Sequence, residues 1–236
     1  MFAKIQTIAL TIALAAVAAF GAESQGYTLN AGDFTRLQVV DGINVNYICD
    51  PDSAGLVSFS CDTKTAPVLM VSNKNGTLKL QLEFTETQPR HLPTVTVRSK
   101  HLEQAENSGD STLVIDTPAP GASIRLRVIG NGKIIAKGLH SSSVEGKIDT
   151  GKGNLVLSGA TVWAKLRTVG TGSIDAGSLK ADKASIVIGG TGSVDCNVSD
   201  ELTVTGLGSG KVYCTGSPQV KNRTLGTVKV ILTDNK

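Results

Sequence analysis

This chain of 236 residues has few aromatic side chains and little net charge. Phe, Trp and Tyr together make up 4% of the residues, fewer than the broad core of an ordinary globular domain would use. The formal net charge of +3 is too small to indicate nucleic-acid binding. The basic residues are also not interleaved with aromatic residues on which bases could stack. We therefore expect no nucleic acid among the partners.

Histidine and cysteine are scarce as well, with three and four residues, and no close pair has the spacing of a zinc site. His91, His101 and His140 lie far apart in the sequence, and no Gly-x-Ser-x-Gly elbow accompanies a partner histidine. The Gly-x-Gly segments differ from phosphate loops because no predicted helix follows them. We therefore expect no cofactor, no metal site and no catalytic set, and we predict that the protein is not an enzyme.

Only one apolar stretch is long, and it lies at the N-terminus. The run from Ile5 to Ala19 is apolar or small apart from three polar residues, follows Lys4, and is followed by small residues up to Ala22. This pattern is typical of a signal peptide, and the run is shorter than the roughly 20 apolar residues of a membrane span. Residues 1–22 are predicted to direct export to a periplasm, cell surface or medium, and an uncleaved anchor is the alternative. The mature chain is predicted to have no transmembrane span.

Glycine, in contrast, is abundant, with 26 residues, and it recurs in a fixed pattern. Gly-x-Gly pairs return about every 20 residues through the second half of the chain, which is the signature of a solenoid. The second glycines of the pairs are Gly132, Gly153, Gly172, Gly192 and Gly210. We assign these glycines to structural turns, because a tight corner favours positive φ and stacked corners leave little room for side chains.

Alternating apolar and polar residues precede and follow each glycine pair, so that one coil is predicted to be strand, glycine turn, strand, turn. Successive coils should lie about 4.8 Å apart, the spacing of strands in a sheet. Ile174, Val194 and Val212 are predicted to form one internal column. Cys196 and Cys214 share the next inward position, where two stacked thiols are favoured over a disulfide.

The N-terminal half has short strand patterns instead of the repeat. Residues 23–33 are small and polar and are predicted to be a flexible leader. Residues 34–100 are predicted to form a β-strand meander that caps the solenoid, with a hairpin turn at Asn75-Gly76 and a second possible hairpin between the strands that carry Cys49 and Cys61. Residues 101–236 are assigned to the glycine-turn repeats.

The segment Val40-Asp41-Gly42-Ile43-Asn44-Val45, together with the glycine pairs, resembles the auto-transporter adhesin head domain family, also called the head GIN domain. Gly42-Ile43-Asn44 lies where this family has its name-giving triplet, and the resemblance covers roughly residues 30–232. Several corners have Asn, Lys or Thr where the family commonly has Ser. The resemblance implies an all-β, right-handed parallel β-helix without catalytic residues, and a role in adhesion.

Two groups of charged residues are candidate sites. Arg125, Arg127, Lys147, Lys165 and Arg167 are predicted to lie on neighbouring coils of one face, where they could bind anionic glycans, or could simply keep the solenoid soluble. Asp175 and Asp195 share an outward position on adjacent coils. They form a weak candidate for a calcium site or for acid–base chemistry, because calcium requires six to eight oxygen ligands.

The leading interpretation is an exported, non-enzymatic module that binds a host or bacterial surface glycan or protein, most simply in cell adhesion. One alternative is a polysaccharide-active lyase or hydrolase that uses Asp175 and Asp195. Another is a structural part that assembles as a homo-oligomer. Fold resemblance alone does not decide among these functions.

Overall fold

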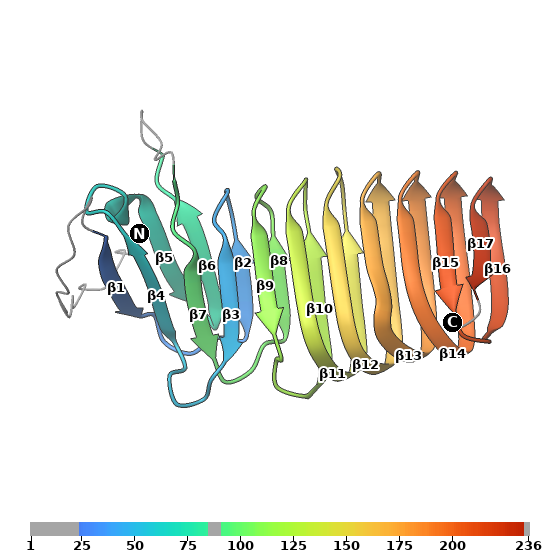
Figure 1. The fold of residues 1–236 in the computed structure, drawn as a ribbon, viewed down its shortest axis with the longest axis horizontal. Helices are drawn as coiled ribbons and strands as arrows, with labels where there is room; N and C mark the ends of the chain where they lie inside the picture. Colours follow the sequence, from blue (N-terminus) through green and yellow to red (C-terminus); the bar gives the residue numbers. More distant parts are fainter. Residues whose placement is uncertain (1–23, 85–90, 234–236) are drawn as a thin grey trace, which may run out of the picture.

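The computed structural model describes residues 24–84 and 91–233, which form one elongated sheet of 17 strands wound into a solenoid (Figure 1). The short 3-10 helix η1 covers Ala66–Val68. The strands of the N-terminal half are β1 (Gln25–Asn30), β2 (Arg36–Val39), β3 (Val45–Cys49), β4 (Leu56–Cys61), β5 (Leu69–Lys74), β6 (Thr77–Leu82), β7 (Val95–Ser99), β8 (Gln104–Asn107) and β9 (Thr112–Asp116). The remaining strands are β10 (Gly121–Val128), β11 (Lys133–Ile148), β12 (Asn154–Gly170), β13 (Ser173–Gly190), β14 (Ser193–Gly208), β15 (Lys211–Thr215), β16 (Gln219–Gly226) and β17 (Lys229–Thr233).

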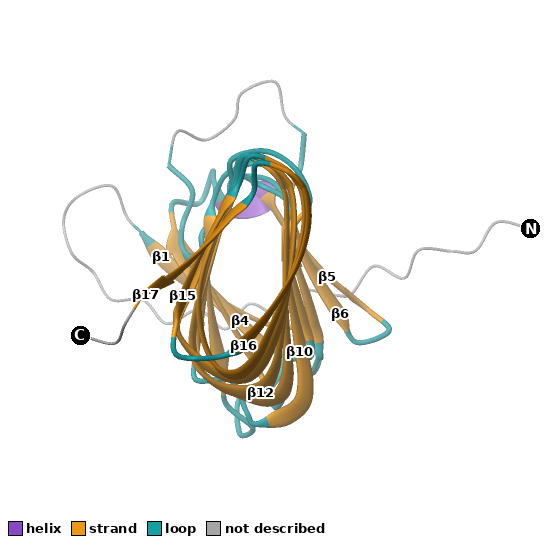
Figure 2. Cartoon of the chain, turned by 90° about the vertical axis from the view of Figure 1, so that its right-hand side faces the viewer, coloured by secondary structure: helices purple, strands orange, loops and turns teal. Residues whose placement is uncertain are grey.

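Each coil contributes one strand segment to each of two long walls, and the coils superpose into a flattened oval when viewed end-on (Figure 2). The first wall contains the strands that precede each glycine corner. These are β2, β6, β8, β10, β16 and the second halves of β11 to β14. The second wall contains β3, β7, β9, β15, β17 and the first halves of β11 to β14. Strands within each wall pair in parallel, so the predicted all-β solenoid is confirmed.

The predicted internal column is also confirmed. Ile174 is paired in register with Val194, and Val194 with Val212, and all three side chains are fully buried. Burial of each such side chain contributes about 1.5–3 kcal/mol. Cys196 and Cys214 are likewise paired in register and buried in the next inward column. A repeat of this length can bury its apolar face only against the coils on either side.

The two glycines of each corner have different structural roles. Positive φ belongs to the first glycine, as in Gly190 with φ of 114°. The second glycine is required by close packing, because a Cβ on Gly192 would lie 2.5 Å from the carbonyl oxygen of Gly172 in the coil below. That oxygen accepts a hydrogen bond from Ser193 N at 3.3 Å, so it has little freedom to move. Steric closeness therefore explains the predicted turn residue Gly192, while positive φ does not.

The strands predicted within residues 34–100 are present, but most of them belong to the solenoid. β2 lies between β6 and β8 in the first wall, and β3 lies between β7 and β9 in the second, all in parallel (Figure 1). The coil formed by β2 and β3 therefore sits between two coils that come later in the sequence. The expected boundary at residue 101 is corrected accordingly, because alternating inward residues such as Leu37 and Val45 continue the same apolar columns.

The segment around Gly42-Ile43-Asn44 forms the corner of this inserted coil. Asp41 takes the positive φ, 69°, that glycine has in later corners, and its carboxylate accepts a hydrogen bond from Leu82 N at 2.8 Å. The carbonyl oxygen of Asn44 accepts from Val95 N at 2.9 Å, and its side-chain oxygen accepts from Thr112 N at 3.0 Å. Ile43 is fully buried. The segment therefore links its coil by hydrogen bonds to both neighbouring coils.

The predicted flexible leader is wrong for Gln25–Asn30, which form β1 and pair antiparallel with β4. Tyr27 explains the ordering of this segment, because its ring stacks on Phe59 of β4 with 5.2 Å between centroids. β5 and β6 form the predicted hairpin at Asn75-Gly76, whereas β3 and β4 do not pair with each other. The proposed signal peptide, residues 1–22, lies outside the described residues.

We expect Gly192→Ala to lower the free energy of unfolding by about 2–3 kcal/mol, because the new methyl group must displace backbone of the adjacent coil. Gly189→Ala is the matched control, since the nearest atom to its Cβ would be Val169 Cγ2 at 3.6 Å. The control should change stability by less than about 0.5 kcal/mol. Urea unfolding followed by circular dichroism measures both variants, and equal destabilisation would refute the packing role of the corner.

A second expectation concerns Tyr47, whose hydroxyl is buried and lies 3.0 Å from Ser99 Oγ. Burial raises the pKa of Tyr47 to about 12 from 10.0, although the hydrogen bond with Ser99 opposes the shift. The folded state thus favours the protonated phenol, and this contribution to stability is complete below pH 10 and is lost between pH 10 and 12. The loss should reach about 2 kcal/mol.

Unfolding free energies of the wild type and of Tyr47→Phe, measured in urea from pH 9 to pH 11.5, test this assignment. The variant should lack the part of the alkaline decline that belongs to Tyr47. Ser99 Oγ keeps a second partner, the carbonyl oxygen of His101 at 3.1 Å, so the variant should still fold. Parallel pH curves for the two proteins would contradict the expectation.

Candidate binding groove

The five predicted basic residues lie together on the outer surface of the first wall. Arg125, Glu145 and Lys165 are register partners on consecutive coils and form one outward column. Arg127, Lys147 and Arg167 form a second column two residues further along the strands. Because strands in each wall are about 4.8 Å apart, residues on alternate coils are separated by about 10 Å. The structure thus brings the predicted residues into two short parallel columns.

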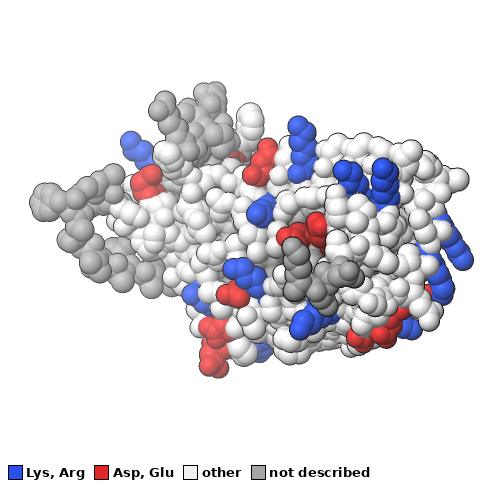
Figure 3. Space-filling model, turned by 45° about the vertical axis from the view of Figure 1, so that its right-hand side comes forward, with Lys and Arg blue, Asp and Glu red and all other residues white. Residues whose placement is uncertain are grey.

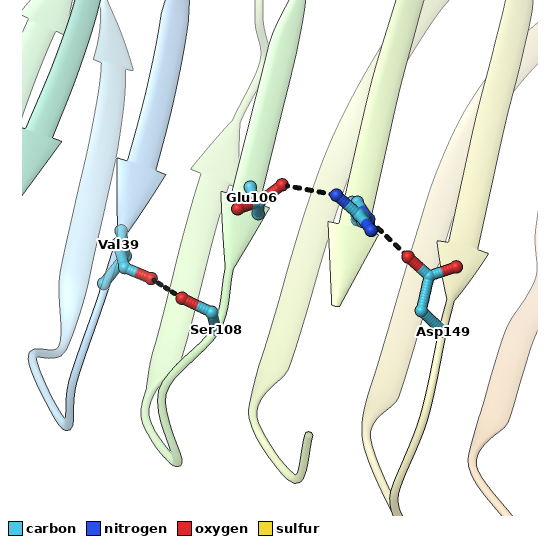
Figure 4. A network of polar contacts seen from close by, with 5 residues as sticks. Val39, Glu106, Ser108 and Asp149 are labelled. Atoms are coloured by element: carbon cyan, nitrogen blue, oxygen red, sulfur yellow. Dashed lines mark hydrogen bonds and ion pairs between the residues drawn. The ribbon is translucent and has the colours of Figure 1, made fainter. Parts of the chain in front are cut away.

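Arg127 and Lys147 are neutralised by acidic neighbours. Arg127 Nη1 lies 3.1 Å from Glu106 Oε2, and Arg127 Nε donates a short hydrogen bond to Asp149. In Figure 4, Glu106 and Asp149 reach the same guanidinium group from opposite sides. The hydrogen bond to Asp149 is the main cause that raises the pKa of Arg127. Lys147 Nζ lies 2.6 Å from Glu145 Oε1.

The other three predicted cations, Arg125, Lys165 and Arg167, are exposed and form no ion pair within residues 24–84 and 91–233. Their charges are therefore free to attract an anion. Basic side chains also occur on other faces, where they are spread among uncharged residues, as Figure 3 shows for one face. The first wall differs because Arg125, Lys165 and Arg167 line grooves in its surface.

Two adjoining grooves lie over the two columns. The larger, about 490 Å³, is lined by Gln104, Arg125, Leu126, Arg127, Glu145, Lys147, Asp149 and Arg167. The smaller, about 240 Å³, is lined by Glu145, Lys147, Trp163, Lys165, Leu166, Arg167, Ser185 and Val187. They share Glu145, Lys147 and Arg167. Together they form one shallow trough, here called the basic groove, that runs across consecutive coils.

Three residues at this groove, Trp163, Glu106 and Asp149, are not among the site residues predicted from the sequence. Trp163 is 42% exposed and points outward from β12, two residues before Lys165, so strand alternation in the sequence was a usable signal. Glu106 and Asp149 come from coils on either side of Arg127. Both lie about one coil period from Arg127 in the sequence, 21 residues before it and 22 after it, so the repeat spacing was a usable signal for these ion pairs too.

Asp175 and Asp195 are register partners on the second wall, as predicted. Their neighbours in the same outward column are Val156 and Tyr213, which supply no additional carboxylate. Partial burial, and secondarily the charge of Asp175, raise the pKa of Asp195. Asp175 accepts a hydrogen bond from Gly177 N at 3.3 Å. In the described part of the chain, no group of three or more His, Cys, Asp or Glu side chains is arranged to hold a metal ion.

Among the described residues, no helix has the length and apolar character that crossing a bilayer requires. The fold and the groove define an elongated β-solenoid with a charged groove on one wall. The chain belongs to the family described as "Putative auto-transporter adhesin, head GIN domain", which it matches over residues 33–218. The resemblance noted in the sequence is thereby confirmed. A comparison with functionally curated proteins found none that matches.

Solved structures from Bacteroides and Parabacteroides species have the same fold. A "putative adhesin" from Bacteroides fragilis is 21% identical with a TM-score of 0.77, over 89% of this chain and 98% of that one. A "putative lipid binding protein" from Parabacteroides distasonis is 18% identical with a TM-score of 0.72, over 89% and 96%. A "putative adhesin" from Parabacteroides merdae is 17% identical with a TM-score of 0.68, over 89% and 96%. At these identities the likeness shows the shared fold.

We expect Asp195→Asn to stabilise the protein at pH 7 by about 0.5 kcal/mol, a small value because the carboxylates are partly solvated. Since folding raises the pKa of Asp195, its contribution to stability is complete at low pH and is lost as pH rises through the folded value. The gain should therefore vanish near pH 3. Asp182→Asn, on the exposed surface, is the control. Destabilisation at pH 7 in urea unfolding would instead indicate a bound proton or cation.

Proposed function

We propose that this protein is an exported, non-enzymatic adhesion module that binds extended anionic polymers of a host or bacterial surface through the basic groove. The observation that carries the proposal is the trough on the first wall, in which Arg125, Lys165 and Arg167 lack acidic partners in the described structure. Export is supported by the signal-peptide pattern of residues 1–22 and by membership of an adhesin family.

The shape of the site favours a polymer over a small molecule. Small-molecule pockets are concave and largely apolar, and they enclose most of their ligand. The basic groove instead spans strands of consecutive coils; its larger part is lined mainly by charged and polar side chains, and its smaller part adds the apolar surface of Trp163 and Val187. An elongated ligand can contact several coils at once and gain affinity from each contact. The lipid-binding name of one similar structure is not adopted for this chain, because the shallow groove does not enclose an acyl chain and places charged side chains along its length.

The alternative of an acid-catalysed polysaccharide lyase or hydrolase has less support. Its candidate residues, Asp175 and Asp195, lie on the second wall, away from the basic groove. Their column provides Val156 and Tyr213 where a third acid or a basic partner would be needed. The groove itself offers Glu145 and Asp149, which are engaged with Lys147 and Arg127.

The homo-oligomeric alternative involves the C-terminal coil. β16 and β17 each pair on one side only within the described chain, and Leu225 and Leu232 are exposed there. Lys221 and Lys229 flank the same edge, however, and lysines on an edge strand oppose pairing with another copy. Light scattering of the mature protein decides this point independently of ligand binding.

Immobilised mature protein, residues 23–236, should retain fluorescent hyaluronan or polygalacturonate and should release both at about 0.5 M NaCl, where charge attraction is strongly screened. Neutral dextran of the same length is the control polymer and should not be retained. Incubation with polygalacturonate, with and without calcium, should release no new chain ends. Absence of binding to every acidic polymer would refute the proposed function, and turnover abolished by Asp175→Asn would favour the enzyme.

A further inference from the structure

We infer that the basic groove selects anionic polysaccharides by the spacing of their charges. Its preferred ligand has acidic groups about 10 Å apart, twice the separation of adjacent coils, and lies along the solenoid axis. This inference rests on the proposed function and specifies its ligand class. It identifies Arg125, Lys165 and Arg167 as the anion-binding residues, Trp163 as the ring-binding residue and Glu145 as the residue that sets the spacing.

The spacing follows from the order of charges along the outward columns. Arg125 lies on β10, and Lys165 and Arg167 lie on β12, with β11 between them in the first wall. The intervening coil presents Glu145 in the first column and Lys147 in the second, and these two neutralise each other at 2.6 Å. Along the axis, the groove therefore offers a cation, then an acidic position, then two cations.

Glu145 makes the intermediate position unfavourable for an anion. It lines both parts of the groove, and its register partners are Arg125 on one side and Lys165 on the other. A ligand acid placed over this coil would find Lys147 already paired with Glu145, so it would gain no free cation and would still lie close to a carboxylate of like charge. Polymers with an acid on every sugar ring must bring one acid near Glu145. Polymers with an acid on alternate rings avoid that contact, so the site discriminates by repulsion as well as attraction.

The ends of the groove limit the ligand to two binding positions for acidic groups. Toward the N-terminal end, the coil before Arg125 presents uncharged Gln104 in the same column, and Arg127, beside Arg125 on β10, is already held between Glu106 and Asp149. Toward the C-terminal end, the coil after Lys165 and Arg167 presents Ser185 and Val187, which have no charge. The shortest complete ligand therefore has two acidic groups with one uncharged unit between them.

Trp163 favours a sugar over an acidic peptide. It lies on β12 together with Lys165 and Arg167, and alternation directs all three outward from one strand. The flat indole can cover the C–H face of a pyranose ring while the neighbouring cations bind its acidic group. An extended peptide places side chains of one face about 7 Å apart, because each residue advances about 3.3 Å. That spacing does not match cations on alternate coils.

Two soluble probes with the same number of sugar rings test the spacing. Hyaluronan octasaccharide has one carboxylate on every second ring, and octagalacturonate has one on every ring. Binding to the full mature protein is measured by calorimetry at about 0.05 M NaCl, where charge interactions are screened less than at physiological salt. We expect hyaluronan octasaccharide to bind at least tenfold more tightly, although it has half the charge.

Single substitutions test which residues are responsible for the preference for hyaluronan. Arg167→Gln should weaken hyaluronan binding about tenfold, and Trp163→Ala should weaken it by a similar factor. Glu145→Gln should strengthen octagalacturonate binding at least fivefold and reduce the preference between the probes, because it removes the repulsion and releases Lys147. Arg223→Gln is the matched control, since Arg223 lies in the same outward column as Arg167, three coils further on. It should leave both affinities unchanged.

The outcomes separate the two proposals. Equal affinity for the two probes, or an unchanged preference in Glu145→Gln, overturns the spacing rule while leaving polymer binding intact. A loss in Arg223→Gln as large as in Arg167→Gln also overturns it, since attraction would then be diffuse. If neither probe nor any other acidic polymer binds, the proposed function fails with it. Thermal unfolding of each variant, expected within about 2 °C of wild type, identifies any that lose affinity through misfolding.

Discussion

The structure depends on the close approach of backbone at its glycine corners. In the coils from β11 onward, the carbonyl oxygen of a corner glycine occupies the space where a side chain of the next coil would begin, as Gly172 does beneath Gly192. This closeness lets the hydrogen-bonded pairing of the walls continue around the corner, as the bond from Ser193 N to Gly172 O shows. Coils that are stacked so closely keep their register. Equivalent residues of successive coils therefore line up in continuous columns, both inside and outside the walls.

Much of this arrangement could be predicted from the sequence because both of its periods are visible there. The glycine pairs mark the coil length, and alternation within each strand separates inward residues such as Val194 from outward ones such as Lys165. The five basic residues could be placed on one face for the same reason. Asn75-Gly76 also identified its hairpin by local chemistry alone.

The order of the coils could not be predicted, because short alternating strands contain no information about which neighbour they pair with. β2 and β3 look like any other pair of strands, yet they lie between coils that follow them in the chain. The partners of Arg127 are a different case, since Glu106 and Asp149 lie 21 and 22 residues away, about one coil, and only the choice of partner among outward charged residues is left to side-chain conformation. The corner at Asp41 could not be recognised by a glycine pair, because an aspartate there takes the positive φ that glycine has in later corners.

The inserted coil has a consequence for how the solenoid responds to pulling. Among the described residues, the coil of β16 and β17 pairs with neighbours on one side only, so tension applied to β17 can separate it one hydrogen bond at a time. The coil of β2 and β3 is hydrogen-bonded to a neighbouring coil on each side. Pulling it out requires two sets of strand-to-strand hydrogen bonds in each wall to break together. β1 pairs only with β4 among the described strands, so a load applied through it first separates that single ladder, and the inserted coil bears the load only after β1 has been pulled away.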